Sequence, residues 1–248
     1  WDRNRIDGVD ISTFQPEQVN GHRLIDWAKA ISAGVKFVVA RASFVEGGVF
    51  KLDPTFPEHA ARVLGAGIEL SGYHFFGPST DETDVGDQAK RFVDACGKSI
   101  TLAPACDLET RGRGAGLQPA PLADATESFL STVDELTGRR TWLYNGSYFV
   151  RDNLREESGR FASRLLWLPE YGAAQPQVPR PWCEAAIWQA QGDGDTCPGF
   201  PGAVDRNVLA DGVTLEHLRS GVVPPLAPDL TTPRGLQSAL RMLGYDVG

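Results

Sequence analysis

Two acidic residues, Asp107 and Glu109, follow the apolar residues 100–106 and are separated by Leu108. In a β-strand, alternate side chains point to the same side, so both carboxyls would lie on one surface with their Cα atoms about 6.5 Å apart. Repulsion between the carboxylates would raise the pKa of one of them, which could then act as an acid while the other stays anionic. Glycoside hydrolysis requires this combination, although two solvated acids at the end of a strand would show the same spacing.

The elements around this pair alternate between apolar, β-branched runs and amphipathic helical patterns. We expect strands at residues 6–11, 35–42, 68–76, 100–109, 141–145, 165–168, 185–190 and 203–207. We expect helices at residues 24–33, 54–64, 83–96 and 122–137, and the helical patterns become less regular in the second half. Such alternation is typical of βα units, so the chain is expected to be an α/β protein with a TIM-like barrel of mostly parallel strands.

Polar and aromatic side chains recur near the ends of these predicted strands. In a barrel of parallel strands, functional residues gather at the carboxyl ends of the strands. The residues at or near such ends are Asp10, Arg41, Tyr73, Asp107, Glu109, Tyr144, Trp167, Gln189 and Asp205. We therefore expect these side chains to converge on one face of the barrel.

The composition limits the class of protein. The 248 residues are 42% hydrophobic and 23% charged, as in ordinary soluble globular domains. The formal net charge of −8 argues against binding to nucleic acid or to an anionic membrane, because both draw on clustered lysines and arginines. No apolar run is long enough to span a membrane, and the first residues lack the apolar region of a secretory signal. A chain that begins with Trp1 rather than Met is expected to have been processed or trimmed.

The four cysteines, Cys96, Cys106, Cys183 and Cys197, form no Cys-x-x-Cys pair, and the four histidines are scattered. This spacing predicts neither a zinc site nor another metal site. The even number of cysteines allows bridges between Cys96 and Cys106 and between Cys183 and Cys197, which would fit an oxidising compartment. Buried free thiols are an equally good interpretation.

Short motifs that contain these residues are spread over most of the chain. They are Gly8-Val9-Asp10-Ile11-Ser12, Ile25-Asp26-Trp27, residues 37–43, Asp53-Pro54-Thr55-Phe56, Gly72-Tyr73-His74-Phe75-Phe76, Asp107-Leu108-Glu109, Trp188-Gln189 and Val204-Asp205-Arg206-Asn207. In this order and spacing they resemble the glycoside hydrolase family 25 lysozymes, the Chalaropsis-type N-acetylmuramidases. The resemblance covers residues 6–219, and several motifs in register are more specific than any one alone. It implies a modified barrel of the type (β/α)5(β)3.

The resemblance also implies a role for each of four acids. Glu109 would be the general acid and base, and Asp107 would assist the N-acetyl group of the substrate in forming an oxazolinium ion. Asp10 and Asp205 would complete the catalytic group. Four carboxylates in one concave site would raise one another's proton affinity and keep Glu109 protonated near neutral pH.

Substrate-binding roles are expected for six further residues, namely Tyr73, Arg41, Tyr144, Trp167, Trp188 and Gln189. Tyr73 would hydrogen-bond a carboxylate or the substrate amide, or else pack in the core. Arg41 would either order Asp10 or touch the substrate.

The aromatic candidates Tyr144, Trp167 and Trp188 would serve as sugar platforms or belong to the barrel core. His74 follows Tyr73 and should therefore point outward to the helix layer, in a structural role. The glycine-rich residues 112–116 lack the Lys-Ser/Thr of a phosphate-binding loop and are expected to form a mobile rim of the cleft.

The implied activity is that of a lysozyme that hydrolyses the β-1,4 bond between N-acetylmuramic acid and N-acetylglucosamine in bacterial peptidoglycan. Two alternatives are an inactive cell-wall carbohydrate-binding protein and a glycosidase acting on another N-acetylated polymer such as chitin. A pure binder would gain little from several buried like charges, which disfavours it. We expect a monomer that needs no cofactor, binds peptidoglycan but no nucleic acid, and does not insert into membranes. It would be secreted, extracellular or released by a phage lysis system.

The character of the chain changes after Leu218. Residues 221–230 are rich in proline and predict a linker. Residues 231–248 contain one amphipathic helix and are too few to bury a core of their own. This tail resembles the first helix of a small peptidoglycan-binding module. We therefore expect a catalytic barrel over residues 1–220, followed by the linker and a fragment of a second domain.

Overall fold

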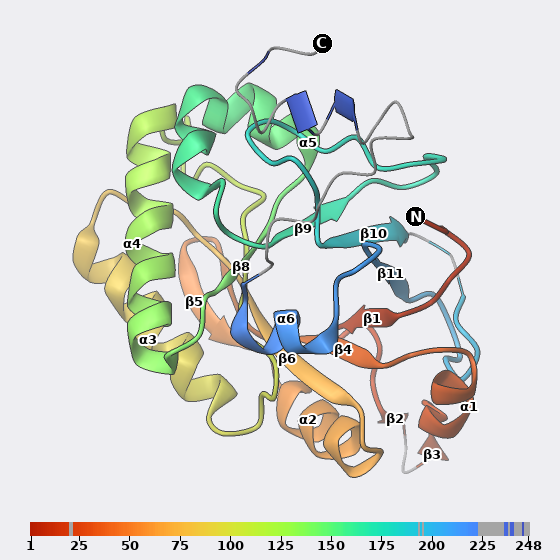
Figure 1. Ribbon diagram of the computed structural model, residues 1–248. Coiled ribbons are helices and arrows are strands. Elements are labelled where there is room, and N and C mark those ends of the chain that lie inside the picture. Colours follow the sequence, from red (N-terminus) through yellow and green to blue (C-terminus); the bar gives the residue numbers. More distant parts are fainter. Residues whose placement is uncertain are drawn as a thin grey trace.

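The computed structural model describes residues 1–19, 22–192, 194 and 196–222, together with five positions of the tail, 236, 237, 239, 240 and 245. A nine-stranded sheet dominates the fold, and all its strands except β5 close into a barrel (Figure 1). The barrel strands are β1 (Gly8–Ile11), β4 (Phe37–Glu46), β6 (Glu69–Phe75), β7 (Ala105–Asp107), β8 (Trp142–Tyr144), β9 (Leu166–Pro169), β10 (Ile187–Gln191) and β11 (Asp205–Leu209). The predicted α/β barrel is thus confirmed.

The first strand closes the barrel because it has two neighbours. β1 pairs in parallel with β4 and antiparallel with β11. The pairing between β10 and β11 is also antiparallel, whereas every other neighbouring pair in the barrel is parallel. The carboxyl ends of seven parallel strands therefore meet at one rim, and β11 enters the barrel from that rim.

Helices cover the first half of the barrel more regularly than the second half. They are α1 (Trp27–Ser32), α2 (Phe56–Gly65), α3 (Glu82–Cys96) and α4 (Pro119–Thr137), and α3 and α4 lie side by side in Figure 1. Asp81 caps α3 by accepting hydrogen bonds from the amides of Thr83 and Asp84, as expected of an acidic residue at a helix start. Between β8 and β9 the chain forms only α5 (Ser147–Phe149), a π-helical turn (Val150–Leu154) and a 3-10 turn (Arg155–Phe161).

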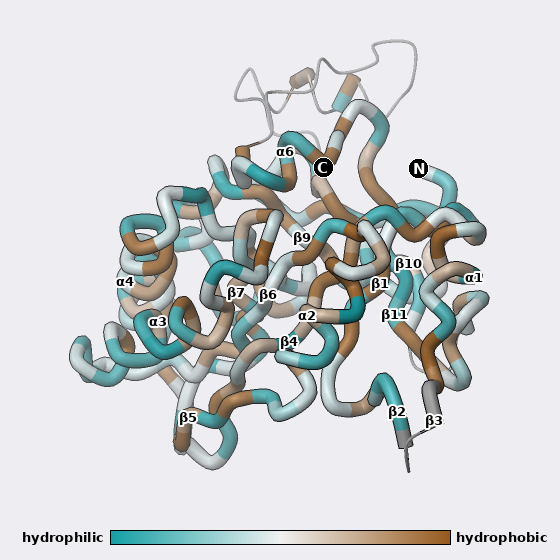
Figure 2. Tube along the Cα trace, turned by 90° about the horizontal axis from the view of Figure 1, so that it is seen from below, coloured by the Kyte–Doolittle hydropathy of each residue, from teal (hydrophilic) through white to brown (hydrophobic). Residues whose placement is uncertain are grey.

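The two ends of the barrel are built differently. α6 (Leu215–Ser220) lies across the amino ends of the parallel strands, where the Leu218 carbonyl accepts a hydrogen bond from the amide of Ala103. Three short strands, β2 (Gln18–Val19), β3 (His22–Arg23) and β5 (Val49–Leu52), extend away from the end covered by α6, as Figure 2 shows. These strands were not predicted. β5 forms a hairpin with β4 through Gly47 and Gly48, both at positive φ, which is the backbone that a tight hairpin turn requires.

The predicted strand at residues 100–109 is much shorter in the structure. Only Ala105–Asp107 form β7, while the amides of Thr101 and Leu102 both donate to the carbonyl of Leu70. Pro104 stands directly before the strand and has no backbone N–H to donate to the ladder, which explains why pairing begins after it. Glu109 therefore lies beyond the strand rather than within it.

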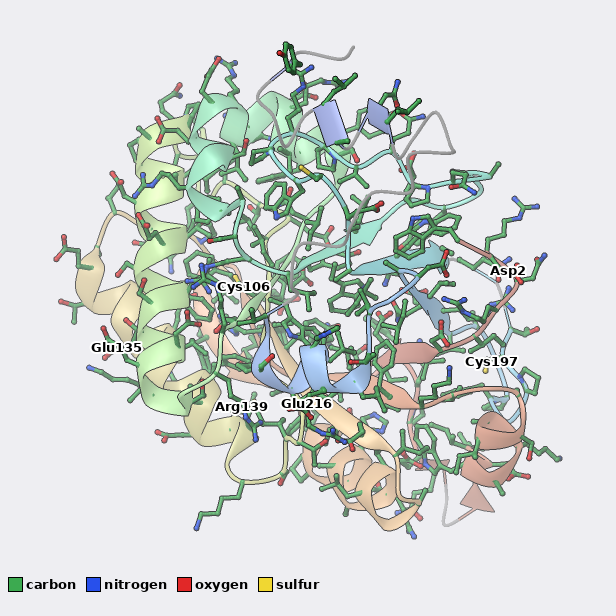
Figure 3. All side chains as sticks on the ribbon, viewed as in Figure 1. Asp2, Cys106, Glu135, Arg139, Cys197 and Glu216 are labelled. Atoms are coloured by element: carbon green, nitrogen blue, oxygen red, sulfur yellow. The ribbon has the colours of Figure 1, made fainter. Side chains whose placement is uncertain are left out.

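The cysteines form neither of the two bridges that the sequence allowed. Cys96, Cys106 and Cys197 are free thiols, and all three are buried. Figure 3 shows Cys106 in the barrel wall and Cys197 beside α1, on different sides of the molecule. The second of the two interpretations, buried thiols, holds for these three residues.

Most of the predicted linker and tail, residues 221–230 and 231–248, lies outside the described residues. Within the described part, no helix has both the length and the apolar character needed to cross a bilayer.

Candidate active site

Two of the predicted acids face each other where the barrel closes. Asp10 on β1 and Asp205 on β11 are paired in register across the antiparallel ladder. The side-chain amide of Gln189 on β10 joins them, because its Nε2 donates to both oxygens of Asp10 at 3.0 and 2.9 Å and to Oδ2 of Asp205 at 3.1 Å. Asn207 Nδ2 donates to Oδ2 of Asp10 at 2.8 Å.

Burial raises the pKa of Asp10 to about 8, and the charge of Asp205 acts in the same direction. The hydrogen bonds from Gln189 and Asn207 oppose this shift but do not cancel it. At neutral pH the Asp10–Asp205 pair therefore carries less than two negative charges.

The second pair, Asp107 and Glu109, lies at the end of β7. Asp107 is 7% exposed and pairs in register with Phe75 and Tyr144, whereas Glu109 is exposed at the rim. Burial raises the pKa of Asp107, and the charge of Glu109, a hydrogen bond with it and the charge of Asp10 add to the effect. The carboxyl end of Glu109 is partly buried against Asp107, which also raises its pKa, but its hydrogen bond with Asp107 acts in the opposite direction.

Mutual repulsion among four carboxylates was expected to keep Glu109 protonated, but the causes of these pKa shifts are different. Partial burial of the Glu109 carboxyl, rather than repulsion from the other acids, raises its pKa. The charge of Asp10 instead raises the pKa of Asp107. The two carboxyls of the pair therefore hold a proton between them. Asp107 Oδ1 is buried and has no hydrogen-bond partner within the described part of the chain. A polar group from outside the protein can satisfy it.

Tyr73 lies at the carboxyl end of β6, where its ring packs edge-on against Trp167 with 6.1 Å between the centroids. Burial raises the pKa of its phenol, and the charges of Asp107 and Asp10 raise it further. The hydroxyl is therefore a neutral donor between the two acidic pairs.

Arg41 does not order Asp10. Its Nε donates to Oδ2 of Asp53 at 2.8 Å. Asp53 also accepts hydrogen bonds from the amide and hydroxyl of Thr55 at 3.0 and 2.6 Å and from the amide of Thr13 at 3.2 Å. Burial alone would raise the pKa of Asp53, but the bonds from Thr55 and Arg41 lower it. Asp53 is thus a fixed anion that holds Arg41 at the edge of the site, a role that the sequence did not predict for it.

The predicted aromatic platforms are buried. Trp167 is 2% exposed and donates from Nε1 to Oδ1 of Asn207 at 2.7 Å, beneath the ring of Tyr144. The hydroxyl of Tyr144 donates to Oε1 of Gln189 at 2.8 Å. These rings form the floor of the site, and the core interpretation applies to them rather than the platform interpretation.

Trp188 lies outside the site altogether. Side chains alternate along β10, so Gln189 faces the barrel interior while Trp188 faces outward. Trp188 is 0% exposed, packs against Trp1 and donates from Nε1 to the carbonyl of Glu170 at 2.9 Å. It cannot stack on a sugar in this position. His74 also points outward as predicted, between Ser43 and Gln88 at 2.8 and 3.2 Å.

Two other members of the site were missed in the sequence. Asn207 follows Asp205 by two residues on β11 and so faces the same side, a signal that the strand pattern contained. Tyr171 follows the end of β9, and its hydroxyl donates to Oε1 of Gln189 at 2.7 Å. No periodicity marks a residue that lies beyond a strand.

Two hollows open at this face of the barrel. A pocket of about 300 Å³ is lined by Asp10, Ile11, Ser12, Phe14, Gln15, Arg41, Tyr73, Ala203 and Asp205. A larger groove of about 960 Å³ runs between the β4–β5 hairpin and residues 110–117, the segment that follows Glu109 in the chain. Arg113 contacts the carbonyl of Gly48 across this groove. The glycine-rich segment therefore lines the cleft, while its expected mobility stays a prediction.

The arrangement can do acid–base chemistry on a bond placed between the two pairs. Asp107 and Glu109 supply a shared proton beside an unpartnered carboxyl oxygen, and Asp10 and Asp205 supply a second, hydrogen-bonded acid pair. Among the described residues, no group of three His, Cys, Asp or Glu side chains has the geometry of a metal site.

The chain is similar to a known protein family and to several solved structures. The family model described as glycosyl hydrolases family 25 matches residues 9–197. The uncharacterized protein YegX of Escherichia coli K12 is 28% identical over 219 residues, which are 88% of this chain and 73% of that protein. A muramidase from Acremonium alcalophilum is 27% identical, with a TM-score of 0.70, over 88% of this chain and 100% of that chain. A bacterial lysozyme from Streptomyces coelicolor has a TM-score of 0.72 at 21% identity, over 88% and 98% of the two chains.

Proposed function

The chain belongs to glycosyl hydrolase family 25, and from this premise we propose that it is a lysozyme, an N-acetylmuramidase of bacterial peptidoglycan. The bond cleaved would be the β-1,4 bond from N-acetylmuramic acid to N-acetylglucosamine. The observation that carries the proposal is the pair Asp107 and Glu109, whose pKa values are both raised at the open end of the barrel. The muramidase from Acremonium alcalophilum, which aligns over the whole of its length, supports the same activity.

In the proposed mechanism the shared proton moves when substrate binds. Asp107 is the more buried member of the pair and holds the proton in the free protein. Its unpartnered Oδ1 would accept the N–H of the substrate's acetamido group, which favours the anionic form of Asp107. The proton then passes to Glu109, which faces the solvent side of the cleft.

Glu109 next donates this proton to the glycosidic oxygen as the bond to the anomeric carbon breaks. The acetamido carbonyl oxygen attacks the anomeric carbon and forms an oxazolinium ion, whose positive charge Asp107 stabilises. Glu109, now a carboxylate, removes a proton from the water that opens this ring. The product is a new reducing end, and Glu109 is protonated again.

The experiment compares wild type with Glu109→Gln and Asp107→Asn on a suspension of purified bacterial cell walls. We expect wild type to clear the suspension and each variant to lose activity about 100-fold or more, because a positioned acid contributes at least that much. Glu135→Gln is the matched control, since Glu135 lies exposed on the outer face of α4 (Figure 3). Unchanged clearing by Glu109→Gln would remove this residue from the mechanism.

The products and a second polymer identify the substrate. Reduction of the digest followed by mass spectrometry should show N-acetylmuramic acid at the new reducing ends. Cleavage of chitin at a similar rate would indicate a glycosidase of broader range, and binding to walls without cleavage would indicate an inactive carbohydrate-binding protein. The proposal includes action outside the producing cell, by secretion or by phage lysis, and a catalytic barrel over residues 1–220, followed by a linker at 221–230 and a fragment at 231–248 that resembles the first helix of a peptidoglycan-binding domain.

A further inference from the structure

Phe14 is a large apolar side chain left open at the acid pocket. It is 78% exposed and lies in the loop that follows β1, where it lines the pocket together with Asp10, Arg41 and Tyr73. Exposing a phenyl ring to water is unfavourable. Single exposed apolar side chains are common on proteins, but this ring lines the acid pocket, where a ligand can cover it if the loop holds it in place.

The loop is held in place on both sides of Phe14. On the pocket side, Gln15 Oε1 accepts from the amide of Ser12 at 3.1 Å, and Gln15 Nε2 donates to the carbonyl of Ala203 at 3.3 Å. The amide of Thr13 donates to Asp53, the anion that also holds Arg41. These contacts fix the backbone on each side of the ring.

A buried polar cluster fastens the end of the same loop. Glu17 accepts from Trp27 Nε1 at 3.2 Å through Oε2 and contacts His59 Nδ1 at 3.1 Å through Oε1. The other ring nitrogen of His59 lies 3.3 Å from the carbonyl of Ser12. Glu17 and His59 are both fully or almost fully buried, and buried polar groups tied in this way rigidify their surroundings. The side chains of Glu17, Trp27 and His59 thus hold the loop that carries Phe14.

The orientation of the ring is also constrained. The guanidinium carbon of Arg41 lies 5.6 Å from the centroid of Phe14, within the range of a cation–π contact. Because Asp53 fixes Arg41, the ring has a defined neighbour on the pocket wall.

The distribution of aromatic residues favours a ligand. In the described part of residues 1–222, the exposed aromatic side chains are Phe14, Tyr148 and Tyr171, which follow the carboxyl ends of β1, β8 and β9. They therefore lie on the face that carries the acids. Trp167 and Trp188, the sugar platforms expected from sequence, are buried. Of the three exposed rings, Phe14 lines the pocket of Asp10 and Asp205.

We propose that Phe14 is a specificity-determining residue, on which the pyranose ring bound in the Asp10–Asp205 pocket stacks. This inference rests on the proposed function. The C–H face of a pyranose is apolar and covers an aromatic ring while its hydroxyls point to polar groups. A pocket of about 300 Å³ is at the small end of ligand sites, which suits a single sugar unit. The loop is organised before binding, so stacking costs little conformational entropy.

The test uses soluble oligosaccharides of alternating N-acetylglucosamine and N-acetylmuramic acid. We expect Phe14→Ala to raise KM about ten-fold with little change in kcat, because the apolar surface of the ring is no longer buried by the sugar. Phe14→Trp, which keeps an aromatic face, should restore a KM close to that of wild type. Leu136→Ala is the matched control, because it removes an exposed apolar side chain from α4, in the helix layer.

A binding measurement separates this inference from the proposed function. In the Glu109→Gln background, Kd for the same oligosaccharide should rise about ten-fold with Phe14→Ala and return with Phe14→Trp. An unchanged Kd and KM in a Phe14→Ala protein with the thermal midpoint of wild type would overturn the inference, even if wild type cleaves the oligosaccharide. If wild type neither binds nor cleaves it, the proposed function fails first, and the inference falls with it.

Discussion

At the scale of single residues, Gln189 organises the acid site. Its amide uses both of its polar ends, because Nε2 donates to Asp10 and Asp205 while Oε1 accepts from the hydroxyls of Tyr144 and Tyr171. A carboxylate in its place could not donate to the acids. The residue therefore sets both the positions and the charge of the groups around it.

We predict that Gln189→Glu damages activity and stability together. The substitution removes two donors from buried carboxyls and adds a third acid beside them, so the free energy of unfolding should fall by about 1–3 kcal/mol. Lysis of cell walls should fall strongly as well. Urea denaturation and turbidity assays measure the two effects. Gln118→Glu is the control, since Gln118 stands at the start of α4, where a negative charge is tolerated. Equal losses in both variants would argue against a special role for Gln189.

The sequence predicted the acids better than their partners. Asp10, Asp107 and Asp205 stand at strand ends or starts, so the barrel rule was enough to bring them to one rim. Arg41 was expected to contact Asp10 or the substrate. In the structure it donates a hydrogen bond to Asp53, which follows the unpredicted strand β5. A contact of this kind depends on where a hairpin returns, which residue spacing alone does not give.

At the scale of elements, long periodic segments were predicted well and short or irregular ones were not. The observed α3 (Glu82–Cys96) differs from the predicted helix by one residue at its start. The hairpin strand β5 (Val49–Leu52) was missed because three of its four residues are exposed and it has no buried face to produce a pattern. The π-helical and 3-10 turns after β8 likewise lack the period of an α-helix.

Close packing of elements gives an independent prediction. A Cβ added to Gly8 on β1 would lie 2.4 Å from the ring of Phe37 on the neighbouring β4, inside the barrel. Gly8→Ala should therefore lower the free energy of unfolding by about 1–3 kcal/mol, as expected for overpacking. Gly86→Ala in the middle of α3 meets nothing within 4 Å and should raise it by about 0.5–1 kcal/mol through helix propensity. Denaturant titration of both variants measures the contrast, and destabilisation by Gly86→Ala alone would contradict it.

At the scale of the whole molecule, barrel closure creates the site and also lowers the stability of the fold. Asp10 and Asp205 are far apart in the chain and meet because β11 pairs with β1. In the unfolded chain these carboxyls are solvated and distant, whereas the fold buries Asp10 beside a like charge. At a pH where Asp10 is ionised, the fold is therefore less stable than it would be with a neutral residue at position 10.

The final prediction follows from this difference in proton binding. The pKa of Asp10 is about 8 in the fold and close to its ordinary value of 3.8 in the unfolded chain. Between these values the native protein keeps a proton that the unfolded chain has lost, so stability falls as the pH rises and the loss is complete above the native pKa. Asp10→Asn cannot ionise, and its thermal midpoint relative to wild type should therefore increase from pH 4 to pH 8. Asp87→Asn, exposed on α3 and outside the cluster, serves as the control. A midpoint difference for Asp10→Asn that stays constant over this range would show that Asp10 does not retain its proton in the fold.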